Sequence, residues 1–393
     1  MLTVNEAREK IIENIKTCKE TIEIPFFESA GYVLAEDIIS NINVPDFPKS
    51  AMDGYAFNHK DLIDGDKFKV IGENAAGDFN NYDYEKNTCV RVMTGGYVPE
   101  GYDCVVKQED VLIENDMIKV LNPVGKHFNY CVVGEDIKKG EILIKSGTVI
   151  NSGHIGIFAG IGLDKIKVCR PLKVSLISTG SELTKPGEKL EAGKIYAIST
   201  FMIESILEKY KIEVVSNKII DDDIDHIKSS LKKESKDADI IITTGGVSVG
   251  KYDYIKKVYE LLNMKTLFTK VKMKPGTPVT SGIYDDTLIL SVSGNPFAAM
   301  VNFQVLFWAA VEKYYGCSYY RNKLYERIVK DSYLKPSKLN RFVRAKTDGN
   351  FVVLENFHNS SVISNLAECN CLVLQNPNEE IKEGDKVNII YLF

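Results

Sequence analysis

Three strand-to-helix junctions in the middle of the sequence combine glycine with hydroxyl side chains. They read STGSEL at 178–183, TTGGVSVGKYDY at 243–254 and SGNPFAAM at 293–300. Backbone N–H groups in such turns, and at the start of a following helix, favour bound anions. One such turn is a common structural element, but three at one edge of a sheet favour an anion pocket. The expected lining is Thr179, Gly180, Gly245, Gly246, Ser248, Gly250, Ser293, Gly294 and Asn295.

The glycine loop at 245–250 matches neither standard nucleotide motif. It has no G-x-G-x-x-G of the dinucleotide folds and no G-K-[ST] of the P-loop at the required spacing. In the third junction, Asn295 is placed as a helix N-cap, with Pro296 at the first helical position. These turns predict an anion site without identifying the anion.

Three carboxylates, Glu182, Asp222 and Asp253, fall just after predicted strands of the same sheet. They should therefore lie along its ligand-binding edge. Carboxylates beside anion-binding loops make sense when a hard cation lies between them, and Mg²⁺ binds through a few carboxylates, water and phosphate oxygens. We expect these acids to hold Mg²⁺. The alternative, for Asp222 and Asp253, is that each only stabilises the first turn of the next helix.

Alternating lysines precede a turn in KVKMKPGTP at 270–278. We expect Lys270 and Lys274 to point the same way from a strand, with Lys272 opposite, and Pro275 to end the strand. Lysines directed together favour a bound anion. The alternative is a solvated edge strand protected by lysine.

Strands that alternate with helices from about residue 171 to 320 position these groups. Such spacing predicts a doubly wound, mostly parallel sheet, whose ligands bind at the carboxyl edge. The fold class we predict is therefore multidomain α/β plus β: a central doubly wound α/β domain, a β-rich N-terminal region and a small C-terminal β-barrel-like domain. The expected domains are 1–45 with 140–168 (helical and extended linker), 46–139 (β-rich), 169–320 (α/β) and 321–393 (C-terminal).

Composition limits the classes of function. The 393 residues carry a formal charge of −5, which argues against a large nucleic-acid surface. No apolar run approaches a membrane span, and the N-terminus has no signal-peptide segment. We expect eight reduced cysteines in a cytoplasmic protein, and no metal site at the isolated C-x-C of Cys369 and Cys371.

Turn-rich segments of the β-rich region hold further polar residues. Asp53 lies in PKSAMDGYAF, Thr94 in RVMTGGYVPEGYDCVV and Asp136 in VGEDIKKGE. A carboxylate beside glycine is often only part of a turn. Taken alone, none of these residues identifies a site.

Together these segments closely resemble the molybdopterin molybdenumtransferase family, the molybdenum-inserting enzymes related to the gephyrin E domain. The shared motifs run in family order from residue 46 to about 345: SAMDGYA, VRVMTGG, GED, STGSEL, TTGGVSVGKYDY, MKPGTP, SGNPFAAMV and RFVRA. The resemblance implies adenylylated molybdopterin and molybdate as substrates, Mg²⁺ as cofactor, and molybdenum cofactor and AMP as products. It also implies a homodimer, with each active site between the α/β domain of one subunit and the SAMDGYA domain of its partner.

The resemblance also implies roles at matching positions. The expected catalytic residues are Asp53, Asp136, Lys270 and Lys274. Thr94, Pro275, Arg344 and a serine, Ser360 or Ser364, join the substrate-binding residues, with Glu182, Asp222 and Asp253 as metal ligands. The chain departs from the family at KPGTP, where Thr277 replaces a lysine, and at HNSSVIS, where the family has a glutamine-glycine-serine pattern.

Other functions stay open at this point. The chain could be a molybdopterin adenylyltransferase, could handle tungsten, since Thr277 lies near the expected molybdate pocket, or could be a non-catalytic scaffold like gephyrin. A molybdopterin adenylyltransferase is also a possible protein partner.

Overall fold

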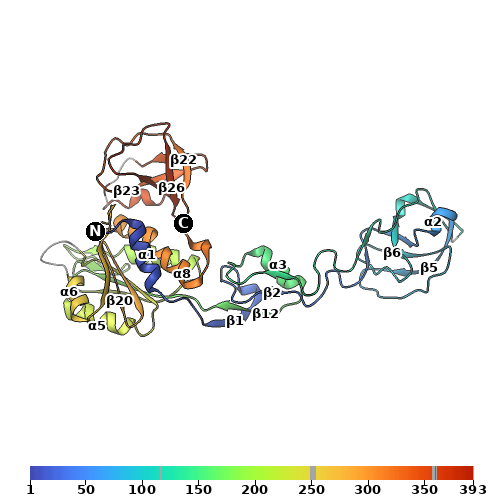
Figure 1. The fold of residues 1–393 in the computed structure, drawn as a ribbon, viewed down its shortest axis with the longest axis horizontal. Helices are drawn as coiled ribbons and strands as arrows, with labels where there is room; N and C mark the ends of the chain where they lie inside the picture. Colours follow the sequence, from blue (N-terminus) through green and yellow to red (C-terminus); the bar gives the residue numbers. More distant parts are fainter. Residues whose placement is uncertain (116, 248–253, 356–358, 360, 393) are drawn as a thin grey trace.

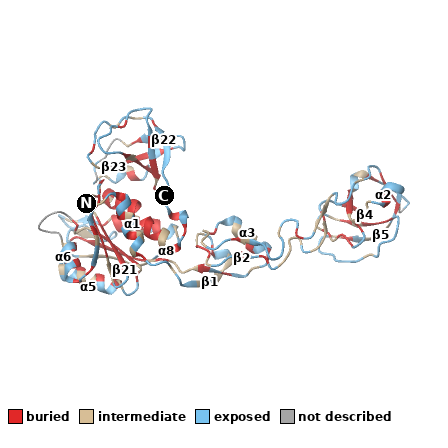
Figure 2. Cartoon of the chain, in the orientation of Figure 1, coloured by how far each residue is buried: buried red, intermediate tan, exposed pale blue. Residues whose placement is uncertain are grey.

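The chain forms an elongated structure in which one long arm leaves a larger body. The computed structural model describes all residues except 116, 248–253, 356–358, 360 and 393. An α/β domain and a C-terminal β domain lie at one end, a small domain lies in the middle, and a β-rich domain lies at the far end (Figure 1). Figure 2 shows that buried residues follow the sheets and the helices that cover them.

The α/β domain is built on a six-stranded sheet. Its strand order is β16 (Glu213–Ile220), β13 (Lys173–Thr179), β17 (Ile240–Thr244), β21 (Thr287–Val292), β20 (Pro278–Tyr284) and β18 (Lys265–Lys270). The first four strands are parallel, and β20 and β18 are antiparallel additions. The central strands β13, β17 and β21 are buried along almost their whole length because helices cover both faces of the sheet.

Successive residues of these strands face the two helical layers in turn. Leu176 and Ile242 pack into the core with α4 (Ser199–Lys209), α7 (Pro296–Asn302) and α8 (Trp308–Tyr315). Ile177 and Ile241 pack on the other side with α5 (Ile224–Glu234) and α6 (Tyr254–Leu261). The predicted doubly wound domain is confirmed.

The N-terminal helix α1 (Val4–Asn14) belongs by its packing to the α/β domain. Its buried residues Val4, Ala7 and Ile11 join the core that contains α7 and α8. The expectation that residues 1–45 pack with 140–168 is therefore wrong at this helix. Periodicity shows that a helix buries one face, but it does not show which partner covers that face.

The middle domain is crossed by the chain twice. β1 (Thr21–Pro25) pairs antiparallel with β12 (Lys165–Cys169), and β2 (Ile38–Ile39) pairs with β11 (Ile142–Ile144). Its helix α3 (Ser152–Gly160) is capped by Asn151, whose side chain accepts a hydrogen bond from the His154 backbone N–H.

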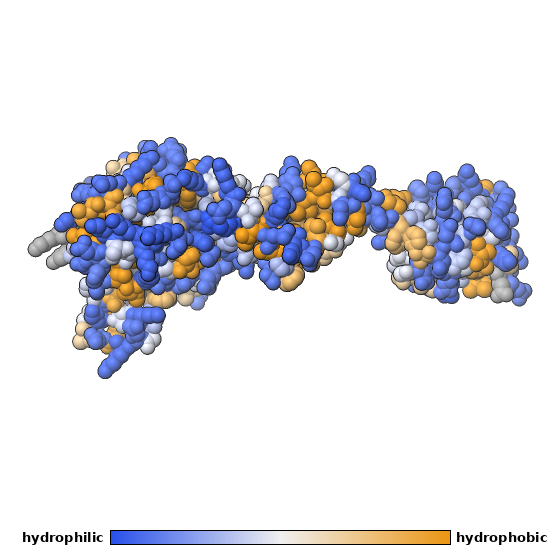
Figure 3. Space-filling model, turned by 90° about the horizontal axis from the view of Figure 1, so that it is seen from below, coloured by the Kyte–Doolittle hydropathy of each residue, from blue (hydrophilic) through white to orange (hydrophobic). Residues whose placement is uncertain are grey.

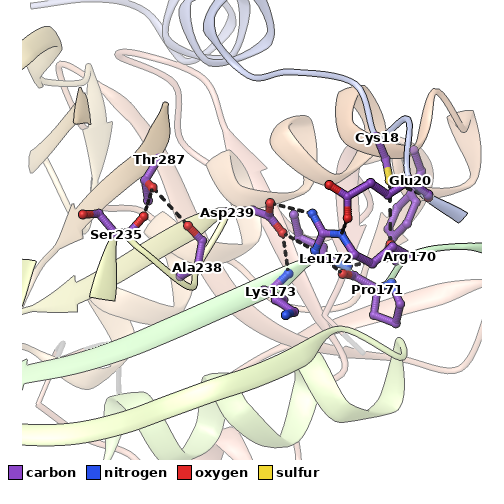
Figure 4. Close-up of polar contacts among 11 residues, drawn as sticks. Cys18, Glu20, Arg170, Pro171, Leu172, Lys173, Ser235, Ala238, Asp239 and Thr287 are labelled. Atoms are coloured by element: carbon purple, nitrogen blue, oxygen red, sulfur yellow. Dashed lines mark hydrogen bonds and ion pairs between the residues drawn. The ribbon is translucent and has the colours of Figure 1, made fainter. Parts of the chain in front are cut away.

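A charged cluster joins the middle domain to the α/β domain (Figure 4). Arg170 follows β12 and donates two hydrogen bonds to Asp239, which lies just before β17, at 3.0 and 2.9 Å. The Glu20 carboxylate contacts Arg170 Nε at 2.9 Å, and the Lys173 N–H donates to Asp239. These hydrogen bonds raise the pKa of Arg170. Both chain crossings, near 20 and near 170, are thus fixed to the sheet.

The far domain is a second six-stranded sheet, of order β7 (Cys104–Lys107), β4 (Gly54–Phe57), β6 (Thr88–Val92), β5 (Lys67–Asn74), β9 (Met117–Val120) and β8 (Val111–Glu114). Phe57 and Phe68 fill one small core, and Val90 and Val105 fill the other. A short ribbon, β3 (Lys49–Ser50) with β10 (Tyr130–Cys131), connects this domain to the arm.

The C-terminal domain is a closed five-stranded barrel. Its strands are β22 (Tyr325–Val329), β23 (Asn340–Thr347), β24 (Phe351–Leu354), β25 (Cys371–Gln375) and β26 (Lys386–Tyr391). The ring closes because β23 pairs with both β24 and β25. The predicted β-barrel-like domain and the β-rich N-terminal region are both confirmed. Among the described residues, no helix is long and apolar enough to cross a membrane.

Candidate functional site

The three glycine-containing turns come together at the carboxyl edge of the α/β sheet. A Cβ on Gly245 would lie 2.4 Å from the Thr179 carbonyl oxygen, and a Cβ on Gly294 would lie 3.3 Å from the Gly245 Cα. Gly245 also has a φ of +95°. Only glycine allows the turns after β13, β17 and β21 to approach this closely. The expected convergence of Thr179, Gly245 and Gly294 is present.

Asp222 lies beside this junction, after β16. Its backbone N–H is 3.4 Å from the Ser181 hydroxyl, in the turn that also carries Gly180 and Glu182. The Glu182 carboxylate lies over Gly180, where a Cβ would be 2.7 Å from its Oε2. Two of the three predicted metal ligands therefore occupy neighbouring turns.

Two buried oxygens at this edge lack a hydrogen-bond partner among the described residues. They are Asp222 Oδ1 and Thr179 Oγ1, whose side chains lie close to each other without forming a hydrogen bond of regular geometry. Burial raises the pKa of Asp222, and the neighbouring acids Glu182 and Asp221 raise it further, although the Thr179 side chain lowers it. A half-buried carboxylate with an unpaired oxygen and acidic neighbours is a donor set that fits a hard cation. No cluster of three acidic, histidine or cysteine ligands is present in the described part of the chain.

A pocket of about 640 Å³ opens next to these turns. It is lined by Gly180 and Leu183 on one side and by Lys218, Asp221 and His226 on the other. This volume suits a substrate-sized molecule. The pocket is therefore continuous with the turn that carries Glu182.

The lysine segment is split in two. β18 ends at Lys270, and a short strand, β19 (Met273–Lys274), follows. Lys270, Lys272 and Lys274 are all exposed, while Val271 is buried between them. The expectation that Lys272 points away from the other two is wrong, because alternate residues of an extended segment share a face.

The turn after Lys274 is held by internal contacts. The Thr277 hydroxyl donates to the Met273 carbonyl, and the Val271 N–H donates to the Thr277 carbonyl. β19 also pairs in parallel with β23, which places Lys274 opposite Arg341 of the barrel. Pro275 thus lies in a turn fixed to both domains.

Asn302 links two of these turns and was not identified from the sequence. Its Nδ2 donates to the Gly276 carbonyl at 2.8 Å, and its Oδ1 accepts from the Ser293 N–H at 3.3 Å. The side chain is fully buried at the end of α7. A buried amide in the mostly apolar run PFAAMVNFQVLFW, which also holds Gln304, was the available signal.

Arg344 is enclosed by the structure. Its guanidinium donates to the carbonyls of Val362 and Asn359 and lies 4.2 Å from the Phe297 ring centroid. Its exposed fraction is 0%, and burial lowers its pKa. In this position Arg344 holds the carbonyls of Asn359 and Val362 in place, and Ser364, close by in the chain, is exposed.

Asp53 and Thr94 form a pair in the far domain. Asp53 Oδ1 accepts from the Thr94 N–H at 2.7 Å and from its hydroxyl at 2.8 Å. These hydrogen bonds lower the pKa of Asp53. Asp136 is exposed beside the middle domain: its N–H donates to the Val44 carbonyl, and the next residue, Ile137, packs with Val44 against the core of that domain. Within one chain, the middle domain lies between the far domain, which carries Asp53 and Thr94, and the α/β domain (Figure 1).

Several predicted residues lie outside the described part of the chain: Ser248, Gly250, Asp253 and Ser360. Gly246 is described and has a φ of +66°. Asn295 is the N-cap of α7, with Pro296 in the first turn as expected, but its side chain makes no capping hydrogen bond. Its Oδ1 is a further buried oxygen without a partner among the described residues.

Comparisons with known proteins cover nearly the whole chain. Family models match at residues 2–162 (MoeA N-terminal region, domain I and II), 175–313 (probable molybdopterin binding domain) and 327–392 (MoeA C-terminal region, domain IV). A molybdopterin molybdenumtransferase from Staphylococcus aureus strain COL is 33% identical over 399 residues, covering 99% of this chain and 95% of the relative. One from Staphylococcus epidermidis is 32% identical over 400 residues, with the same coverage of 99% and 95%.

Solved structures agree with this assignment. Two crystal structures of the molybdopterin biosynthesis protein MoeA from Pyrococcus horikoshii align over 100% of this chain. One has a TM-score of 0.89 at 25% identity, covering 99% of that chain, and the other has 0.86 at 27%, covering 100%. The chain therefore belongs to the MoeA family of enzymes, the molybdopterin molybdenumtransferases.

Proposed function

We propose that this protein inserts molybdenum into adenylylated molybdopterin, using molybdate and Mg²⁺ and releasing AMP. The observation that supports this most directly is the junction of Thr179, Gly245 and Gly294 beside Asp222. Backbone donors for a phosphate and an unpaired carboxylate oxygen for a cation occur there together. A phosphoanhydride with a bound divalent cation requires this combination of donors.

The α/β side of the site supplies substrate and metal contacts. The turns at 179–180, 245–250 and 293–295 bind the phosphates through backbone N–H groups. Lys270 and Lys274 provide positive charge to phosphate or to the tetrahedral oxyanion, and Asp222, Glu182 and Asp253 hold Mg²⁺. The metal, when bound, neutralises charge on the phosphate oxygens as the anhydride is cleaved. Arg344 acts here through the 359–365 segment, because its own guanidinium is enclosed.

We further propose that a second copy of the chain supplies Asp53, Thr94 and Asp136. Their separation from the α/β turns within one chain favours this arrangement. Apolar side chains also gather over the middle domain in Figure 3, and Phe27, Ile39 and Ile142 are exposed there. Exposed apolar surface of this kind favours association.

We place the reaction in the cytoplasm. All eight cysteines are free, and burial raises the pKa of Cys89 and Cys104 to about 12, which suits structural thiols. A molybdopterin adenylyltransferase is the protein partner that would supply the adenylylated substrate.

The test is release of AMP from adenylylated molybdopterin, measured with molybdate or tungstate and with or without Mg²⁺. AMP release that needs both molybdate and Mg²⁺ is expected. Faster turnover with tungstate would assign a tungsten-handling enzyme. Pyrophosphate release from ATP and molybdopterin would assign an adenylyltransferase, and no turnover with either substrate would favour a scaffold.

A further inference from the structure

Asn302 is the one fully buried side chain described above that bridges two turns of the proposed site. Its amide uses both ends, with Nδ2 on the Gly276 carbonyl at 2.8 Å and Oδ1 on the Ser293 N–H at 3.3 Å. The first contact is in the turn after Lys274, and the second is in the turn that leads to Asn295. One rigid side chain therefore sets the spacing between a lysine turn and a glycine turn.

Asn302 packs closely against Gly276, in the turn after Lys274. Gly276 has a φ of +88°, and a Cβ there would lie 2.3 Å from Asn302 Nδ2. Any other residue at 276 would push the amide away and break the contact with the carbonyl. The glycine and the asparagine thus form a matched pair, and their contact fixes the path of the chain directly after Lys274 and Pro275.

The position of Asn302 in its helix is also unusual. It is the last residue of α7, and a π-helical turn, Phe303–Phe307, follows before α8 continues the same run. Such wide turns are frequent at functional sites. The neighbouring buried residues Val301 and Phe303 are apolar, so a leucine at 302 would pack well if packing were the only requirement.

We propose that Asn302 is a positioning residue for an oxyanion that lies between Lys274 and the 293–295 turn. The oxyanion is tetrahedral, either molybdate or a phosphate of the nucleotide. Asn302 does not touch it. Its amide holds the lysine turn at the distance from Ser293 that lets the Lys274 ammonium and the glycine turn contact the same ion. This inference rests on the proposed function, because the oxyanion is taken to be part of that reaction.

The test compares Asn302→Leu with Thr287→Val. Asn302→Leu removes both hydrogen bonds while keeping the volume. Thr287 lies at the opposite end of β21, and its buried hydroxyl donates to the Ser235 and Ala238 carbonyls (Figure 4). Loss of this hydroxyl is expected to destabilise the same sheet at the end that lies away from the proposed site. Asn302→Ala is the second variant, for use if leucine does not fold.

The measurement is the dissociation constant of the full-length protein for molybdate and, separately, for AMP, by calorimetry. Asn302→Leu is expected to weaken at least one of them by about tenfold, since displacement of a contact by about 1 Å has effects of this size or larger. Thr287→Val is expected to change each of the two dissociation constants by less than about twofold, although it lowers the melting temperature about as much as Asn302→Leu does. Comparing the two anions identifies which one lies at Lys274.

The outcomes separate this inference from the proposed function. If the wild type binds an anion and Asn302→Leu weakens neither more than Thr287→Val does, the positioning role is wrong and the proposed function stands. If the wild type binds neither molybdate nor AMP, both the positioning role and the proposed function are wrong. Hydrogen exchange at the Ser293 amide gives a check that needs no ligand: exchange should be faster in Asn302→Leu and unchanged in Thr287→Val.

Discussion

The guanidinium of Arg344 lies 4.2 Å from the ring centroid of Phe297, and this contact joins two domains. Arg344 comes from β23 of the barrel, and Phe297 comes from the first turn of α7 in the α/β domain. Together with the pairing of Lys274 opposite Arg341, it places the barrel directly on the turns of the candidate site. The barrel is therefore part of the architecture of the site.

Arg344→Met should lower the free energy of unfolding by about 2–4 kcal/mol, because two carbonyls lose a buried, charged donor and the ring contact is lost. The measurement is urea unfolding followed by fluorescence of Trp308, the only tryptophan. Arg321→Met is the control, since the Arg321 guanidinium is exposed and its ion pair with Glu312 should contribute much less. Equal losses in both variants would contradict the enclosed position of Arg344.

Asp222→Asn should stabilise the protein at neutral pH in the absence of divalent cations. The pKa of Asp222 is raised, so the folded state binds a proton more tightly than the unfolded state does. Stability therefore falls as the pH rises from the ordinary aspartate range through the raised pKa. Asparagine removes this penalty. We also expect Mg²⁺ to raise the melting temperature of the wild type, and Asp222→Asn to lose that rise.

The measurement for Asp222→Asn is the melting temperature with and without Mg²⁺ at pH 7. The matched control is Asp225→Asn, on the exposed first turn of α5 nearby. An unchanged Mg²⁺ response in Asp222→Asn would exclude Asp222 as a metal ligand.

Thr94→Val should raise the pKa of Asp53 towards the ordinary aspartate value, because one of its two donors is lost while the backbone N–H remains. A lowered carboxyl pKa favours the folded state above the ordinary pKa, and this contribution is lost as pH falls through the lowered value. NMR titration of the Asp53 carboxyl group measures the shift. Asp348, which also has a lowered pKa but lies in the barrel, is the internal reference and should not move.

Asp239→Ala should cost about 2–4 kcal/mol of unfolding free energy, since Arg170 would lose both of its hydrogen bonds to Asp239 in a partly buried site. Urea unfolding reported by Trp308 measures this loss. Glu13→Ala is the control, because the exposed pair with Lys10 contributes little. A loss as small as that of Glu13→Ala would show that Arg170 and Asp239 do not stabilise the junction.

Much of the fold and part of the site could be predicted from the sequence. Strands that alternate with helices predict the doubly wound sheet. The glycine-hydroxyl turns predict its ligand-binding edge, because the carboxyl ends of parallel strands meet at one edge of the sheet. Thr179, Gly245 and Gly294 were therefore predictable together. The cap at Asn151 was predictable as well, since capping depends on residues close in the chain.

The remaining features could not be predicted from the sequence, because they depend on packing between residues that are far apart in the chain. The sequence of helix α1 shows which of its faces is buried, but not which element packs against that face. The residues that cover it lie near residue 300, far along the chain. The enclosure of Arg344 depends on carbonyls of the 359–365 segment, which no periodicity reveals. Asn302 is one of two amides, with Gln304, in a mostly apolar run, and only its two distant partners explain its role.

The twice-crossed middle domain has a mechanical consequence. A single flexible linker would let the far domain rotate freely about the long axis. Here two antiparallel chain crossings are bonded to each other through β1 and β12, and both are fixed to the sheet at Glu20 and Arg170. The far domain is therefore connected to the sheet through two paired strands rather than through one linker, and the position of Asp53 depends on both crossings.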